Sequence, residues 1–278
     1  MTIAADHRLF DVATEEWFVT SDREVGRPRL DYFADKIHQA SLLVDENLPA
    51  SVYGFQWGPD FYVPGHYHDV DQIQVVVSGS LMFGNRRVLP GEGVYRPCGR
   101  SYNFSTGPTG ATILEIRDVA SFRAAYNERE AAIVGPGAPT VIEGWERPPG
   151  KNDKSVFFDT RSAEVEWPGG WGFGDRARSP ESGSLDLVGF QRLVDFPDED
   201  SFNLLGVVFQ PRASVQAHRQ DAARTVYVLS GRLEVSGRWL PAGAGAYIEP
   251  GGEASFETGD VGAQVIEFRN RRSWTTEW

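Results

Sequence analysis

The feature that most constrains the fold of this chain is an internal repeat. Residues 66–117 align without a gap with residues 218–269, at a constant offset of 152 positions. Roughly a third of the aligned positions are identical, far more than an ungapped chance pairing would give. The shared residues are mostly glycines, which permit turns with positive φ, and apolar residues, which fill the buried face of a strand. The repeat therefore predicts two copies of one backbone.

The repeat also predicts two structural domains. The chain has 278 residues, enough for two domains that each bury a core of their own. In both copies, short runs rich in Val, Ile, Leu and aromatic residues are interrupted about every ten residues by Gly, Pro or Asn, which is typical of an antiparallel sandwich or barrel. We therefore expect an all-β protein.

Two segments outside the repeat have apolar residues at helical spacing, residues 31–44 and residues 118–134. Residues 135–149 are rich in Pro and Gly, as connectors often are. These patterns predict five parts of the chain: an N-terminal arm (1–45), a first barrel (46–120), a helix with a Pro/Gly-rich connector (121–155), a second barrel (156–272) and a C-terminal tail (273–278).

The two copies differ at the positions that could carry chemistry. His66, His68, Gln72 and Tyr102 of the first copy correspond to His218, Gln220, Arg224 and Ala254 of the second. Residues two apart on a strand point to the same face, so His66 and His68 should enter the barrel interior together. Only the first copy keeps two imidazoles, and we expect the functional site there.

The motif spacing resembles that of a known family. Gly65-His66-Tyr67-His68, followed by Gln72 and then Gly79, resembles the first motif of the cupin superfamily. The segment Pro90–Pro97 followed by Tyr102 resembles the second motif. The resemblance implies a bicupin, with two antiparallel β-barrel (double-stranded β-helix, jelly-roll) domains in tandem and a few peripheral helices. The first barrel carries the motif, and the second is degenerate.

In cupins these two motifs surround a divalent metal. The resemblance implies metal ligands at His66, His68, Gln72 and Tyr102, with Gln72 in place of a glutamate and Tyr102 in place of a histidine. We expect one divalent metal per chain, with Fe(II) favoured over zinc, nickel or manganese, and no organic cofactor. An amide carries no charge, so the metal would keep its double charge and favour an anionic substrate.

The second copy is not expected to bind a metal, because Arg224 would repel a cation. We expect Arg224 either to bind an anion or to form an ion pair with Glu249.

Aromatic side chains are frequent around the first motif, and they suit a small ring or alkyl group. An arginine nearby could pair with a carboxylate or phenolate of the substrate. The candidate substrate-binding residues are Trp57, Tyr62, Phe83, Arg96 and Phe104.

Three functions fit these residues. The first, drawn from the resemblance to cupin dioxygenases, is an Fe(II) dioxygenase-type oxidoreductase acting on a small aromatic or enolisable substrate. The second is an oxygen-independent, metal-assisted isomerase, lyase or decarboxylase, with Tyr102 as the base. Tyr102 and Gln72 are the candidate catalytic residues. The third is a non-catalytic cupin that binds a small molecule in a hydrogen-bonding cage.

Charge and composition exclude several partners. The net charge of −12 argues against nucleic acid and anionic membranes. We find no signal-peptide pattern and no apolar run of the ~20 residues that span a bilayer, so we expect a cytoplasmic protein with a small-molecule substrate. The single cysteine, Cys98, excludes an intrachain disulfide. Trp274 and Trp278 near the C-terminus are candidates for a homodimer contact.

Overall fold

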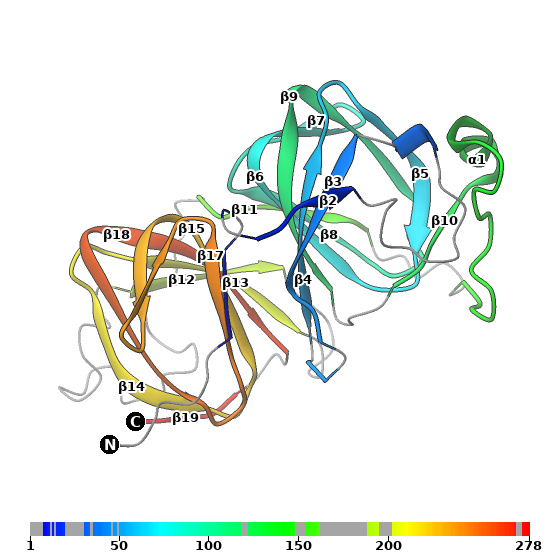
Figure 1. Cartoon of the computed structure of the whole chain (residues 1–278). Coiled ribbons are helices and arrows are strands. Elements are labelled where there is room, and N and C mark those ends of the chain that lie inside the picture. Colours follow the sequence, from blue (N-terminus) through cyan, green and yellow to red (C-terminus); the bar gives the residue numbers. More distant parts are fainter. Residues whose placement is uncertain are drawn as a thin grey trace. The chain divides into compact units, whose positions relative to one another are not determined.

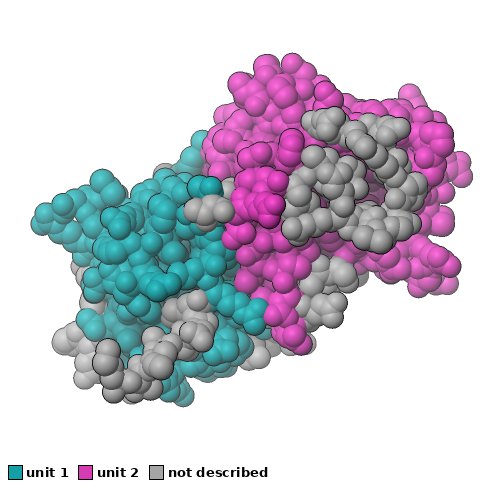
Figure 2. Space-filling model, viewed as in Figure 1, with its two compact units in different colours: residues 1–14, 160–278 teal, residues 15–159 magenta. Residues whose placement is uncertain are grey.

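The computed structural model describes residues 8–11, 13, 15–19, 31–33, 36–45, 47–48, 50–117, 122–147, 154–161, 188–194, 202–270 and 274–278. The chain divides into two compact units (Figure 2). Residues 15–159 form the first barrel, and residues 160–278 form the second barrel together with residues 1–14. Each barrel is an antiparallel sheet rolled around an apolar core (Figure 1). The all-β, two-barrel prediction is confirmed.

The strands of the first barrel pair in the order β11-β8-β6-β9-β4-β3-β2, and β5 pairs with both β9 and β10. Its elements are β2 (Phe18–Val19), the 3-10 helix η2 (Asp31–Phe33), β3 (Ile37–Leu43), β4 (Ser51–Trp57), β5 (Tyr62–His68), β6 (Gln72–Phe83), β7 (Arg86–Val88), β8 (Glu92–Arg96), β9 (Tyr102–Arg117), β10 (Ala124–Tyr126), α1 (Glu128–Val134) and β11 (Val156–Asp159).

The second barrel pairs its strands in the order β1-β17-β15-β18-β13-β12, and β14 pairs with β18 and β19. Its elements are β1 (Arg8–Asp11), β12 (Val188–Val194), β13 (Asn203–Phe209), β14 (Ser214–Gln220), β15 (Arg224–Val235), β16 (Arg238–Pro241), β17 (Ala244–Ile248), β18 (Glu253–Arg269) and β19 (Thr276–Glu277).

The glycines shared by the two copies lie where the backbone has no room for a side chain. Gly79 has a φ of 73°, and a Cβ there would collide with the carbonyl oxygen of Gly110. Gly231 repeats this arrangement, with a φ of 76° and the carbonyl of Gly262 in the same place. Only glycine meets both conditions, so this close approach explains its recurrence at the fixed offset.

The helix predicted over residues 31–44 is wrong. Only the 3-10 helix η2 forms there, and residues 37–43 are strand β3, which pairs with β4. Ile37 lines the cavity and Ala40 is buried on the opposite face of the strand, and a register shift between Ser41 and Leu43 follows. Burial on both faces, together with this shift, gives the buried residues a spacing that imitates a helix. The strands described within the predicted arm (1–45) belong to the barrels, since β2 and β3 join the first sheet and β1 pairs with β17 in the second.

The helix predicted over residues 118–134 is shorter than expected, because α1 begins at Glu128. Residues 124–126 form β10 instead, since they complete the hydrogen bonding of β5. Residues 118–121 lie outside the described part of the chain. The first barrel extends beyond residue 120, because it includes both β10 and β11.

The repeat also extends beyond the aligned segment. Ala124 pairs with His68 in the first barrel, and Thr276 pairs with Gln220 in the second, at the same offset. The predicted C-terminal tail therefore contains strand β19, the counterpart of β10. Among the described residues, no helix is long and apolar enough to cross a membrane.

Candidate functional site in the first barrel

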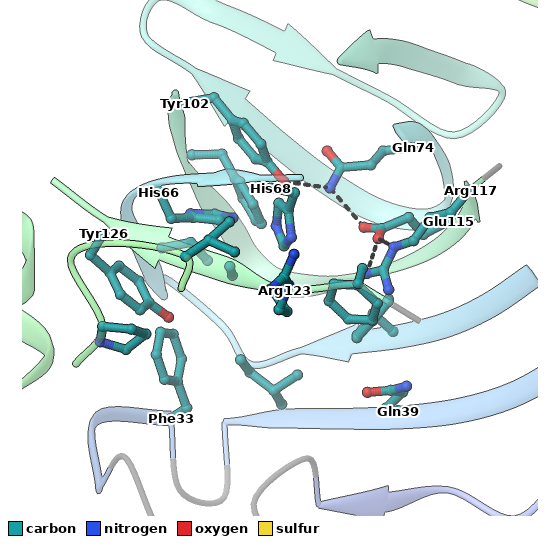
Figure 3. Close-up of a pocket in the computed structure, with 18 of the residues that line it drawn as sticks. Phe33, Gln39, His66, His68, Gln74, Tyr102, Glu115, Arg117, Arg123 and Tyr126 are labelled. Atoms are coloured by element: carbon teal, nitrogen blue, oxygen red, sulfur yellow. Dashed lines mark hydrogen bonds and ion pairs between the residues drawn. The ribbon is translucent and has the colours of Figure 1, made fainter. Parts of the chain in front are cut away.

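The first barrel contains a cavity of about 470 Å³ (Figure 3). Seven of its 22 lining residues are Phe, Trp or Tyr, and the rest include a group of polar side chains. It is lined by Phe33, Ile37, Gln39, Phe55, Trp57, Val63, His66, His68, Gln74, Tyr102, Phe104, Glu115, Arg117, Phe122, Arg123, Ala124, Tyr126, Gly137, Pro139, Val141, Ile142 and Glu143. The volume suits one small organic molecule.

The two motif histidines lie side by side in this cavity, as predicted. His66 and His68 come from alternate positions of β5, and their ring centroids are 5.0 Å apart. Nδ1 of His66 donates to the carbonyl oxygen of Pro64 (2.7 Å), which fixes the ring and leaves Nε2 as the unprotonated nitrogen. A backbone carbonyl often orients a metal-binding imidazole in this way.

Both imidazoles are held in their neutral form. Burial, with smaller contributions from the charges of Arg96 and Arg117, lowers the pKa of His66 to about 4. Burial also lowers the pKa of His68 well below its ordinary value, with contributions from His66 and Arg117. Neutral imidazole is the form that binds a metal, so both rings are ready to act as ligands at neutral pH.

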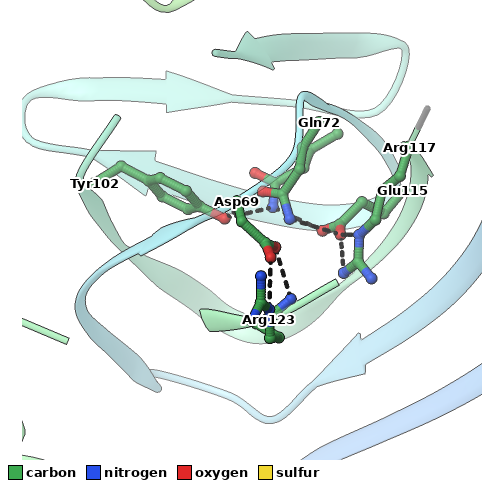
Figure 4. A network of polar contacts seen from close by, with 7 residues as sticks. Asp69, Gln72, Tyr102, Glu115, Arg117 and Arg123 are labelled. Atoms are coloured by element: carbon green, nitrogen blue, oxygen red, sulfur yellow. Dashed lines mark hydrogen bonds and ion pairs between the residues drawn. The ribbon is translucent and has the colours of Figure 1, made fainter. Parts of the chain in front are cut away.

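Figure 4 shows a network of polar side chains that includes Tyr102, whose ring centroid is 4.4 Å from that of His66. The hydroxyl of Tyr102 donates to Oε1 of Gln72 (2.8 Å), whose amide donates in turn to Glu115 (3.3 Å). The amide of Gln74 donates to the other carboxylate oxygen of Glu115 (2.9 Å), and Arg117 forms an ion pair with the same carboxylate. Glu115 is therefore an ionised group fully engaged with its neighbours.

Tyr102 is a neutral phenol in this environment. Burial raises its pKa above the ordinary value, and the charge of Glu115 adds to the effect. The second candidate function requires Tyr102 to act as a base. The protein's own side chains favour instead a hydroxyl that donates a hydrogen bond.

The side chains fit a divalent metal with an unusual ligand set. Among the described residues, no group of three or more His, Cys, Asp or Glu is placed to hold a metal ion. Two imidazoles are available, and Oε1 of Gln74 is buried without a hydrogen-bond partner. Two imidazole nitrogens and one amide oxygen suit a first-row divalent metal.

Gln74 was missed by the sequence analysis, which considered Gln72. Gln72 does not line the cavity, and its Oε1 already accepts the hydroxyl hydrogen of Tyr102. Gln74 lies two residues further along β6, on the same face, and it does line the cavity. Period-two alternation would have included Gln74 as a candidate.

The predicted substrate-binding residues divide into two groups. Trp57 and Phe104 line the cavity, whereas Tyr62, Phe83 and Arg96 do not. The hydroxyl of Tyr62 donates to Glu130 of α1 (3.1 Å). The guanidinium of Arg96 stacks on the far side of the site, 4.2 Å from the ring centroids of both Phe83 and Tyr102. The arginines that line the cavity are Arg117 and Arg123, which sequence reasoning missed.

In the second barrel, an arginine contacts the equivalent histidine. His218 again donates from Nδ1 to a backbone carbonyl, that of Gln216 (2.9 Å), and its Nε2 accepts a hydrogen bond from Nη1 of Arg224 (3.0 Å). Burial and the charge of Arg224 lower the pKa of His218 to about 3. The predicted ion pair between Arg224 and Glu249 is wrong, because the guanidinium points into the barrel.

Comparisons with known proteins show the same architecture. No protein-family model and no curated protein matches the sequence. Among solved structures, a candidate dioxygenase from Nostoc punctiforme is 16% identical with a TM-score of 0.68, covering 96% of this chain and 83% of that one. An oxalate decarboxylase from Bacillus subtilis is 14% identical with a TM-score of 0.61, covering 100% and 80%. These likenesses show the fold, and the predicted architecture of two antiparallel β-barrels in tandem is confirmed.

Proposed function

We propose that the first barrel is the active site of a metal-dependent enzyme acting on a small organic molecule, with an Fe(II) dioxygenase-type oxidoreductase as the first candidate. The observation that carries this proposal is the pair of buried, neutral imidazoles, His66 and His68, on the wall of an aromatic-lined cavity. Neutral histidines that share a cavity are costly to bury unless they bind something.

His66, His68 and the amide oxygen of Gln74 would hold the metal. When bound, a divalent metal supplies Lewis-acid polarisation of substrate oxygens and, if it is redox-active, reactivity towards O2. The rings of Trp57 and Phe104 would exclude water and orient a flat substrate. The amides of Gln72 and Gln74 are hydrogen-bonded to both the hydroxyl of Tyr102 and the carboxylate of Glu115, and so would fix the positions of these two groups.

Oxygen chemistry is supported by the candidate dioxygenase among the structural neighbours. An oxygen-independent reaction, such as a decarboxylation, is the second candidate. It is favoured by the neutral ligand set, because the carboxylate of Glu115 is engaged by Arg117 and the two glutamines. A metal with no carboxylate ligand keeps its full charge and is a stronger Lewis acid for a carboxylate or enolate.

The test is the metal content of purified protein, compared for wild type, His66→Ala and His218→Ala. His218 is the matched control, because it stands at the same motif position in the second barrel and is hydrogen-bonded to Arg224. We expect close to one metal per chain in wild type and in His218→Ala, and loss in His66→Ala. Oxygen uptake with small aromatic acids and diketones, against turnover without oxygen, then separates the two chemistries. If wild-type protein takes up no metal, both enzymatic functions are contradicted, and the non-catalytic binding of a small molecule is the function that stays.

A further inference from the structure

Arg123 is a cation on the wall of the cavity whose position is firmly held. Its backbone N–H and its Nε both donate to the carboxylate of Asp69 (2.8 Å each), and its Nη1 donates to the carbonyl oxygen of Glu143 (2.7 Å). These contacts leave Nη2 without a partner among the described residues. The side chain is half-exposed, and Figure 3 shows it next to His68. A guanidinium fixed in this way needs little reorganisation to bind a ligand.

The second barrel reveals which part of this arrangement belongs to the fold. The backbone N–H of Thr275, at the position of Arg123, donates to Asp221 (2.8 Å), at the position of Asp69. The carboxylate-to-backbone bond is therefore common to both barrels. The guanidinium is an addition of the first barrel, which contains the cavity. A purely structural role would not require it, because the second barrel closes the same turn with a threonine.

The remainder of the cavity indicates what kind of ligand this cation would meet. Its wall offers the rings of Phe33, Phe55 and Phe122 for a flat apolar group. Arg117, which is paired with Glu115, adds a second guanidinium, and its Nη1 is buried without a hydrogen-bond partner. Carboxylates pair with guanidinium groups through charge-assisted hydrogen bonds that neutral groups cannot match. Two arginines beside aromatic rings therefore fit a small aromatic molecule with an anionic group.

We propose that Arg123 is a specificity-determining residue that pairs with a carboxylate on a small aromatic substrate. This inference rests on the proposed function, since it assigns the substrate class of the same cavity. It also moves the anion-binding role from Arg96, which stacks behind Tyr102, to an arginine that lines the cavity.

The experiment compares the binding of benzoate with that of its neutral analogue benzamide, by titration calorimetry on protein loaded with Zn(II), which excludes redox turnover. We expect wild type to bind benzoate about tenfold more tightly than benzamide, as a charge-assisted pair at a half-exposed site would give. Arg123→Gln should bind the two probes equally, and Arg123→Lys should keep part of the preference. The matched control is Arg100→Gln, since Arg100 is exposed and does not line the cavity.

Equal binding of the two probes to wild type, or an unchanged preference in Arg123→Gln, overturns the inference. Thermal melting of each variant verifies that it is folded, and Arg123→Lys tests the same point with the charge retained. Metal content distinguishes this failure from that of the proposed function. A chain that binds metal but does not prefer benzoate overturns the role of Arg123 alone. If the chain binds no metal but shows a benzoate preference that depends on Arg123, the proposed metal-dependent enzyme is contradicted and the carboxylate-binding role of Arg123 is supported.

Discussion

Nη1 of Arg224 donates a hydrogen bond to Nε2 of His218 at 3.0 Å, so a side-chain cation contacts the imidazole nitrogen that would face a metal. In the first barrel the counterparts of these residues are Gln72 and His66, and Nε2 of His66 has no such partner among the described residues. The two barrels thus share a backbone fold but differ in whether the Nε2 atom of the first motif histidine is already hydrogen-bonded to an arginine. In the second barrel, the guanidinium of Arg224 provides a positive charge next to the histidine. In the first barrel, two neutral imidazole rings line the cavity.

Replacing Arg224 by alanine should destabilise the second barrel. The guanidinium is 1% exposed, and its removal would leave a cavity and take the hydrogen bond from His218. We expect a loss of about 2–4 kcal/mol in the free energy of unfolding, measured by chemical denaturation. Arg232→Ala is the control, because Arg232 is exposed and stacks only on Trp239. Equal effects of the two substitutions would mean that the buried contact contributes nothing.

Acid should destabilise the metal-free protein through its buried histidines. The pKa of His66 in the folded chain is about 4, below the 6.5 of an exposed histidine. Between these values the unfolded chain binds more protons, so stability is full above about pH 6.5 and is lost as the pH falls towards 4.

For His66 alone the loss is on the order of 3 kcal/mol over that range. The measurement is the free energy of unfolding at pH 7 and pH 5 for wild type and His66→Asn, after treatment with a chelator. We expect a smaller dependence on pH in the variant. Identical slopes would contradict the depressed pKa.

Gln74 and Gln72 should differ in their effect on metal binding. Gln74 lines the cavity and its buried oxygen has no hydrogen-bond partner, whereas the oxygen of Gln72 accepts a hydrogen bond from Tyr102. We expect Gln74→Ala to weaken metal affinity about 10- to 100-fold and Gln72→Ala to weaken it less. Competition with a chromogenic chelator gives both affinities. The reverse order would restore Gln72 as the ligand that the motif spacing suggested.

Glu130 should anchor α1 next to the histidines. Its Oε2 accepts hydrogen bonds from the backbone N–H of Gly65 and the hydroxyl of Tyr62, both at 3.1 Å. Glu130→Ala would leave both donors unsatisfied, and we expect a loss of about 1–2 kcal/mol with faster amide exchange in α1 and β5. Glu128, exposed on the same helix, provides the control substitution. Unchanged exchange at Gly65 in Glu130→Ala would argue against the anchor.

Local patterns in the sequence predicted most of the fold. The glycine positions of the repeat, such as Gly79 and Gly231, and the alternation of apolar residues predicted two barrels. The helix expected over residues 31–44 is wrong because β3 is buried on both faces and has a register shift near its end, so its buried residues are spaced like those of a helix. A strand with a bulge cannot be distinguished from a helix by spacing alone, since its partner strand decides the register.

The sequence by itself determined that the chain carries two copies of one barrel and that only the first has two inward histidines. Only the tertiary structure decided which other side chains reach them. Glu115 and Arg117 come from the end of β9, Gln74 from β6 and Arg123 from the start of the segment that forms β10. Side-chain alternation is a local property, so His66 and His68 could be paired by spacing. Strand register and barrel closure join residues far apart in the chain, and these depend on long-range packing that no short motif records.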